Sequence, residues 1–359
     1  MESPKAERYA PSMKQGTNAY NSKANGSRKL CVITGGTSGI GRGVVARLLA
    51  DWQNYRITVV ARPSPRINQL HALPGAYERL SVVNGDLASL RSIAKACEEI
   101  QGKLGSDRID VLGLNAGVQI VRANASSADG LELSFAVNFL AHVLIVERLN
   151  RLLRPGGRIV FTSSEVHDPD AFCLMGITRA TWQDPLVLAD VERSQNHIAS
   201  PVDRGEARYC ASKLLGLMYV RHLARALPDV SVLAFNPSVV PGTEIARDRH
   251  TLQQLGWKYV LPLLTPLLPG ARSLKRSASD LLWLMTEADG RCLSGHYVDG
   301  RVAQPGSAES RDEAKIARVV EVGHSLLAAI LHPACADSAQ PVSRDGAQAD
   351  RSLSKGEFS

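Results

Sequence analysis

Six short runs rich in β-branched and aliphatic residues recur along the chain, and segments of helix length separate them. The runs cover residues 29–35, 55–61, 79–85, 109–115, 157–163 and 230–236. Helical periodicity covers residues 41–51, 89–104, 131–153 and 209–227. Strands that alternate with helices in this way are typical of βαβ units. The pattern predicts an α/β fold built on a doubly wound parallel sheet.

The two ends of the 359-residue chain differ from this pattern. Residues 1–28 and 333–359 are polar and show no periodicity, so we expect a disordered leader and a disordered tail. Residues 29–332 are expected to form one domain. Two connections in it are long, 164–208 and about 237–271.

The stretch "TGGTSGIG", residues 34–41, follows the first run directly and precedes a helical segment. Glycine lets the backbone approach a ligand closely, and a helix start directs N–H groups at an anion. The stretch therefore predicts a phosphate-binding loop. A plain strand-to-helix turn is the alternative.

Polar or glycine residues also follow the other runs. Ligands of open parallel sheets bind beyond the carboxyl ends of the strands. The relevant strings are "GDL" with Asp86, "NAG" at 115–117, "SSE" with Ser163 and Ser164, and "NPSVVPGT" from Asn236. They predict a binding site at that edge of the sheet.

The string "YCASK" places Tyr209 and Lys213 four residues apart in a helical segment. Residues i and i+4 share one face of a helix, and a nearby ammonium favours the phenolate. The pair is therefore a candidate for acid–base chemistry, with surface decoration as the alternative.

Composition excludes several other classes of protein. The net charge of +7 comes partly from residues 1–29, which hold six basic and two acidic side chains, and no nucleic-acid-binding motif accompanies them. The six cysteines form no CxxC pair, and we expect them to be reduced in a cytoplasmic protein. We expect neither an integral membrane segment nor a metal site. His142, His167, His222 and His250 lack metal-ligand spacing and are interpreted as packing or surface residues.

Together these strings resemble the short-chain dehydrogenase/reductase family over about residues 29–330. The resemblance is carried by "TGGTSGIG", "GDL", "NAG", "VNFLAH", "IVFTSS", "YCASK" and "NPSVVPGT". The longer strings "RYCASKLLGLMY", "NPSVVPGTEIARD" and "SGHYVDG" are similar to the retinol dehydrogenase and protochlorophyllide reductase-like branch. The resemblance implies a Rossmann fold, a nicotinamide cofactor and a homodimer paired through helices 131–153 and 209–227.

The resemblance also implies a role for individual residues. Tyr209 would be the general acid–base, Lys213 would hold the nicotinamide ribose, Ser164 would bind the substrate oxygen, and Asn138 would hold a water that links the lysine to solvent. The expected cofactor contacts are Gly35, Ser38, Gly39, Ile40, Gly41, Arg62, Asp86, Leu87, Asn115, Ala116, Gly117, Tyr209, Lys213, Pro237 and Thr243.

Two departures from the family pattern concern the site. The usual Pro-Gly after the sixth strand reads Pro237-Ser238, and the gap between Ser164 and Tyr209 is much longer than usual. We interpret the insertion, residues 165–208, as a pocket wall, with a surface excursion as the alternative.

The second run ends without a carboxylate, and Arg62 follows it, with Arg66 nearby. Arginine binds a 2′-phosphate through charge-assisted hydrogen bonds, so we expect NADP(H) as cofactor. The predicted function is NADP(H)-dependent interconversion of a carbonyl and an alcohol, in secondary metabolism. Reduction of an activated C=C bond and a catalytically silent cofactor-binding sensor or scaffold are the alternatives.

The apolar segment "WKYVLPLLTPLLPG", residues 257–270, suggests a bulky, mostly apolar substrate. We expect it to cover the nicotinamide, with Leu263 and Leu267 among the covering residues and a membrane or partner surface in peripheral contact. An ordinary buried loop is the alternative. The sequence does not name the substrate or the direction of the reaction.

Overall fold

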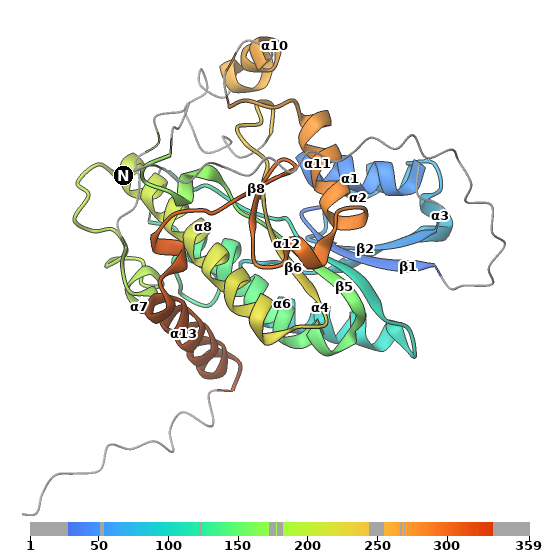
Figure 1. Ribbon diagram of the computed structural model, residues 1–359, viewed down its shortest axis with the longest axis horizontal. Coiled ribbons are helices and arrows are strands. Elements are labelled where there is room, and N and C mark those ends of the chain that lie inside the picture. The colour runs from blue at the N-terminus through green and yellow to red at the C-terminus, as the bar shows by residue number, and fades with distance from the viewer. Residues whose placement is uncertain are drawn as a thin grey trace, which may run out of the picture.

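The computed structural model describes residues 28–50, 54–121, 124–171, 177, 182–243, 255–265, 268 and 270–332. The predicted disordered tail lies outside these residues, as does the predicted leader apart from Arg28. The described residues form a central sheet with helices on both faces (Figure 1).

The sheet has eight strands in the order β3-β2-β1-β4-β5-β6-β7-β8. The strands are β1 Lys29–Thr34, β2 Tyr55–Ala61, β3 Leu80–Asn84, β4 Ile109–Leu114, β5 Leu153–Thr162, β6 Ser231–Asn236, β7 Tyr297–Asp299 and β8 Val302–Gln304. All neighbouring pairs are parallel except β7 and β8. This confirms the predicted doubly wound α/β fold.

Alternate residues along the central strands face the two layers of helices. Leu112 and Leu114 of β4 pack into the core under α4 (Leu90–Leu104), α6 (Ala141–Leu149) and α8 (Pro201–Ala226). Val111 packs into the opposite core, under α1 (Gly39–Ala50) and α11 (Leu274–Thr286). The C-terminal helix α13 (Glu313–Leu331) packs against α8 (Figure 1). Both faces of the strands are therefore buried, as in parallel sheets generally.

Short helices connect these elements. They are α2 Arg66–His71, α3 Ala76–Arg79, α5 Leu133–Phe135, the π-helical turn η1 Ala136–Leu140, η2 Asn150–Leu152, η3 Glu165–His167, α7 Pro185–Leu188, the π-helical turn η5 Gly256–Val260, α10 Leu261–Leu264, α12 Gly290–Leu293 and η7 Glu309–Arg311.

Three element predictions need correction. The strands β7 and β8 were not predicted, because three residues are too few to show a period. Strand β5 begins at Leu153, inside the predicted helix 131–153. Helix α8 begins at Pro201 and not near Tyr209, because the Ser200 hydroxyl accepts a hydrogen bond from the Asp203 N–H and caps the helix.

One helical stretch, Leu133–Leu152, is long and apolar enough by length and composition to cross a membrane. Within the protein, 78% of its most apolar window is buried. It contains α6, which lies in the core between the sheet, α4 and α8. The stretch therefore packs as a core helix.

Candidate active site

A cavity of about 580 Å³ lies at the carboxyl ends of the strands. The segments that follow each of β1 to β6 all contribute to its wall. The chain order reverses between β1 and β4, which is the switch point where open α/β sheets bind their ligands. The sheet edge predicted from the sequence is therefore the edge that holds the cavity.

The glycine loop is closely packed between β1 and α1. Gly35 has φ +68°, and a Cβ there would lie 2.8 Å from the Ala116 Cα. A Cβ on Gly41 would lie 2.3 Å from the Gly35 carbonyl oxygen. Because α1 begins at Gly39, its first turn points free N–H groups beyond the sheet edge. The loop thus fits a phosphate, and Gly35 and Gly41 allow it to pack closely against the turn after β4 and against itself.

A buried network ties the glycine loop to the 115–117 turn. The Thr34 hydroxyl oxygen accepts hydrogen bonds from the N–H groups of Asn115 (3.0 Å) and Ala116 (3.1 Å). His142 Nε2 lies 3.1 Å from the same oxygen, and His142 Nδ1 lies 3.2 Å from the Asn138 carbonyl oxygen. Burial lowers the pKa of His142 to about 3, so the ring is neutral and donates through Nδ1. From the sequence, His142 was interpreted only as a packing or surface residue.

Asn138 lies in the π-helical turn η1 and braces the same turn. Its side-chain oxygen accepts from the Val118 N–H at 2.7 Å, and its amide donates to the Val118 carbonyl at 2.9 Å and to the Ser212 hydroxyl at 2.9 Å. Asn138 therefore links the turn after β4 to α8. Its predicted water-holding role stays a prediction.

Tyr209 and Lys213 lie one turn apart on α8, as their spacing predicted. Lys213 Nζ is 5.6 Å from the centroid of the Tyr209 ring and donates to the Thr162 carbonyl at 2.9 Å. Burial lowers the pKa of Lys213 to about 8. The side chains of Tyr209 and Lys213 both line the cavity. A cationic group thus lies beside a phenol that reaches the cavity.

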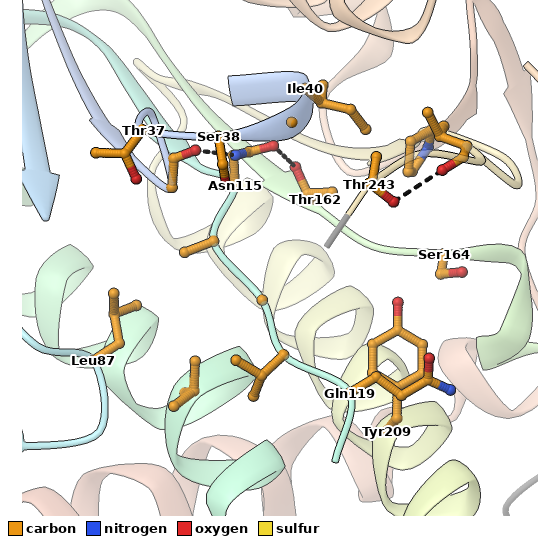
Figure 2. A pocket seen from close by; sticks show the side chains of 18 of the residues that line it. Thr37, Ser38, Ile40, Leu87, Asn115, Gln119, Thr162, Ser164, Tyr209 and Thr243 are labelled. Atoms are coloured by element: carbon orange, nitrogen blue, oxygen red, sulfur yellow. Dashed lines mark hydrogen bonds between the residues drawn. The ribbon is translucent and has the colours of Figure 1, made fainter. Parts of the chain in front are cut away.

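The two adjacent serines after β5 differ in their contacts. Ser163 is 1% exposed, and its hydroxyl donates to the Lys213 carbonyl at 3.4 Å. The Ser164 hydroxyl is 3.4 Å from Glu165 Oε2 and lies on the same side of the cavity as the Tyr209 hydroxyl (Figure 2). This arrangement favours Ser164 as the group that meets a substrate oxygen.

The remaining predicted residues are also gathered at this site. All of them line the cavity except Gly41 and Asn138, which pack behind it. The space at Gly117 is narrow, since a Cβ there would lie 3.3 Å from both Lys213 Nζ and Asn138 Oδ1. Ser238 has φ +61°, so it adopts the left-handed conformation that a glycine at this position would adopt freely.

The cavity wall also contains residues beyond the predicted site residues, and Trp257 among them belongs to the apolar segment 257–270 that was expected to cover the nicotinamide. They are Val118, Gln119, Glu165, Val166, Ile177, Val239, Val240 and Trp257. Trp257 is 7% exposed, and its indole N–H donates to the Thr243 carbonyl at 2.8 Å. Leu263, expected in the cover, is 80% exposed and does not line the cavity. Leu267 lies outside the described residues.

The insertion, residues 165–208, serves two purposes. Glu165, Val166 and Ile177 line the cavity, in agreement with a pocket wall. Farther along, the buried Arg208 guanidinium donates to the carbonyls of Val191 (2.6 Å) and Ser194 (3.1 Å). These bonds fix the later part of the insertion to α8 at Arg208, directly beside Tyr209.

No group of three or more His, Cys, Asp or Glu side chains within the described ranges could hold a metal ion. The site instead joins a glycine loop at a helix start to a buried Ser-Tyr-Lys set. This fold and this set define a Rossmann-type oxidoreductase.

Comparison with known proteins gives the family. A family model described as short chain dehydrogenase matches residues 29–172. A Streptomyces sp. (strain C5) protein named as a daunorubicin C-13 ketoreductase is 28% identical over 299 residues, which cover 81% of this chain and 89% of that protein. Retinol dehydrogenase 14 of Mus musculus is 29% identical over 239 residues, covering 62% of this chain and 64% of the relative. These matches confirm the resemblance to the short-chain dehydrogenase/reductase family and to its retinol dehydrogenase-like branch.

Solved structures agree on the fold. The crystal structure of NADPH-bound carbonyl reductase from chicken fatty liver has a TM-score of 0.56 and 17% identity, and covers 77% of this chain and 97% of that one. At this level of identity the similarity concerns the fold alone.

Proposed function

We propose that the protein is an NADP(H)-dependent oxidoreductase that interconverts a carbonyl and an alcohol on a bulky, mostly apolar molecule. The observation that carries the proposal is a single cavity with Ser164, Tyr209 and Lys213 on one side and Arg62 and Arg66 on another. Such a cavity provides acid–base groups and a cationic anchor for one extended cofactor.

The residues present fit a dinucleotide. We assign the glycine loop at Gly35 to the diphosphate, Asp86 and Leu87 to the adenine, and Lys213 to the nicotinamide ribose, since all of these residues line the cavity. When bound, the nicotinamide supplies or accepts the hydride.

The protein's own residues would handle the proton. The substrate oxygen accepts hydrogen bonds from the Ser164 and Tyr209 hydroxyls, and Tyr209 gives its proton as that oxygen gains negative charge. The tyrosinate that remains is stabilised by the Lys213 ammonium. In the oxidative direction Tyr209 takes the proton from the alcohol.

The preference for NADP(H) rests on Arg62. Its side chain is 61% exposed at the end of β2 and lies 4.0 Å from Asp86, a pairing weak enough to leave it available for a phosphate. We expect Arg62→Ala to weaken NADPH binding about tenfold while changing NADH binding little. Arg91→Ala, an exposed position on α4 outside the cavity, is the control. Equal affinity of the unaltered protein for NADH and NADPH in fluorescence titrations would contradict this preference.

The substrate class rests on the apolar residues of the cavity wall, where Val166 packs with Ile177 and Val239 packs with Trp257. The names of two relatives refer to daunorubicin and to retinol, which are large molecules with extensive apolar surface. We infer a substrate of similar character and, from the first name, a place in secondary metabolism.

The test is NADPH consumption by the purified protein with a panel of ketones, aldehydes and enones, and product identification for each. Alcohols as products support the proposal. Saturated ketones from the enones alone would indicate C=C reduction instead. No turnover with any member, together with tight NADPH binding, would favour a silent cofactor-binding protein.

A further inference from the structure

Gln119 is a buried polar residue that the proposed chemistry does not use. It follows the Asn138-braced residue Val118 and is 5% exposed. Its amide nitrogen, Nε2, has no hydrogen-bond partner among the described residues. A buried donor without an acceptor is costly, so such groups are rare without a functional reason.

The Gln119 side chain belongs to the cavity and not to the core behind it. It lines the cavity together with Tyr209, and Figure 2 shows both side chains among those at the wall. The Val118 N–H and carbonyl are both bound to the Asn138 side chain, so the backbone that carries Gln119 is held in place. The donor is therefore preorganised towards a ligand.

The reacting oxygen of the substrate is not the acceptor that Gln119 needs. A carbonyl oxygen has two lone pairs, and in the proposed function the Ser164 and Tyr209 hydroxyls take both. Val166 and Ile177, which line the same cavity, offer no side-chain acceptor, and the Glu165 carboxylate in that lining accepts no hydrogen bond from Nε2.

We infer that Gln119 donates a hydrogen bond to a second oxygen of the substrate. This inference rests on the proposed function and narrows its substrate class to apolar molecules that carry a further carbonyl or hydroxyl oxygen near the reacting carbonyl. Sites that bind a polar group in this way discriminate strongly against analogues that lack it, because the buried donor is then left unpaired.

The experiment measures kcat/KM with NADPH for matched phenyl ketones. Propiophenone, butyrophenone and valerophenone are compared with 1-phenylpropane-1,2-dione, 1-phenylbutane-1,3-dione and 1-phenylpentane-1,4-dione, which add an oxygen at increasing separation. The readout is the ratio of each dione to its parent ketone, in the unaltered protein and in Gln119→Leu. Dividing the two ratios removes the intrinsic reactivity of the dione.

We expect the ratio for at least one dione to fall about tenfold or more in Gln119→Leu. Gln119→Glu, which replaces the donor by an acceptor, should lower it as well. Gln101→Leu is the matched control, since Gln101 lies on α4 and donates to the Arg148 carbonyl at the surface. Its ratios should equal those of the unaltered protein.

Three results would overturn the inference. The first is that the dione-to-ketone ratios in Gln119→Leu equal those of the unaltered protein. The second is that Gln119→Glu preserves the ratios of the unaltered protein. The third is that Gln119→Leu weakens NADPH binding in the absence of ketone by the factor by which the ratio falls, which would assign the donor to the cofactor. Failure of the proposed function looks different, because then neither the parent ketones nor the diones are turned over.

Discussion

Lys213 carries a charge in a place where charge is costly. Lys213 is 3% exposed, and its ammonium donates a hydrogen bond to the Thr162 carbonyl. Burial disfavours the charged form and lowers the pKa from 10.5 to about 8. A buried residue with a shifted pKa is typical of a functional site, where residues needed for the reaction can lower the stability of the protein.

The lowered pKa predicts a pH dependence of stability. Between pH 8 and 10.5 the folded protein has released the Lys213 proton, whereas the unfolded chain still binds it. The contribution of Lys213 to the free energy of unfolding therefore increases as the pH rises from 8 to 10.5. Denaturant unfolding at several pH values should show the unaltered protein gaining about 1–3 kcal/mol relative to Lys213→Met. If the free energies of unfolding of the two proteins changed with pH in parallel, burial would not destabilise the Lys213 ammonium.

At the scale of single elements, we expect glycine-to-alanine substitutions in two helices to have opposite effects on stability. In α8, a Cβ on Gly216 would lie 2.4 Å from the Phe161 ring, in the core between the helix and β5. In α4, a Cβ on Gly102 would meet nothing within 4 Å. Gly216→Ala should therefore destabilise the protein by about 1–3 kcal/mol or more, and Gly102→Ala should stabilise it by up to about 1 kcal/mol.

Thermal and denaturant unfolding of both variants measure this difference. The pair controls for helix propensity, because the added methyl group is identical. An unchanged melting temperature for Gly216→Ala would mean that α8 does not pack on β5 as closely as described.

Elements with a strong local signal were predictable from the sequence. The six long strands, the glycine loop and the Tyr209–Lys213 spacing follow from local periodicity and from residue chemistry. The start of α8 also had a signal, since Ser200-Pro201 is a typical helix cap, but the motif at Tyr209 drew attention to a later residue. Gln119 could not be predicted, because it reaches the cavity from a connection whose path depends on packing and not on periodicity. Trp257 was predicted only as part of the apolar segment 257–270, and not as an individual wall residue.

At the scale of the whole molecule, segments that are far apart in the sequence together form one cavity with apolar wall residues. We therefore expect kcat/KM to depend on the size of the substrate. Burying one CH₂ contributes about 0.8 kcal/mol, so kcat/KM should rise up to about fourfold per methylene along a series of alkyl ketones. Trp257→Ala should flatten this dependence, because the indole forms part of the cavity wall. Leu263→Ser should not, because Leu263 is 80% exposed on α10. A flat series in the unaltered protein, or better turnover of small polar carbonyls, would contradict an apolar substrate site.

The expected homodimer remains a prediction at this scale. It comes from the family resemblance, and light scattering of the purified protein would decide it.

The most direct test of the account compares the unaltered protein with Tyr209→Phe, using NADPH and a ketone that the panel shows to be a substrate. The substitution keeps the ring and removes the proton donor. NADPH affinity should therefore change little, and kcat should fall by about 100-fold or more. Tyr77→Phe is the matched control, because Tyr77 is 97% exposed and lies outside the cavity. Turnover by Tyr209→Phe at close to the unaltered rate would contradict the central claim that Tyr209 transfers the proton.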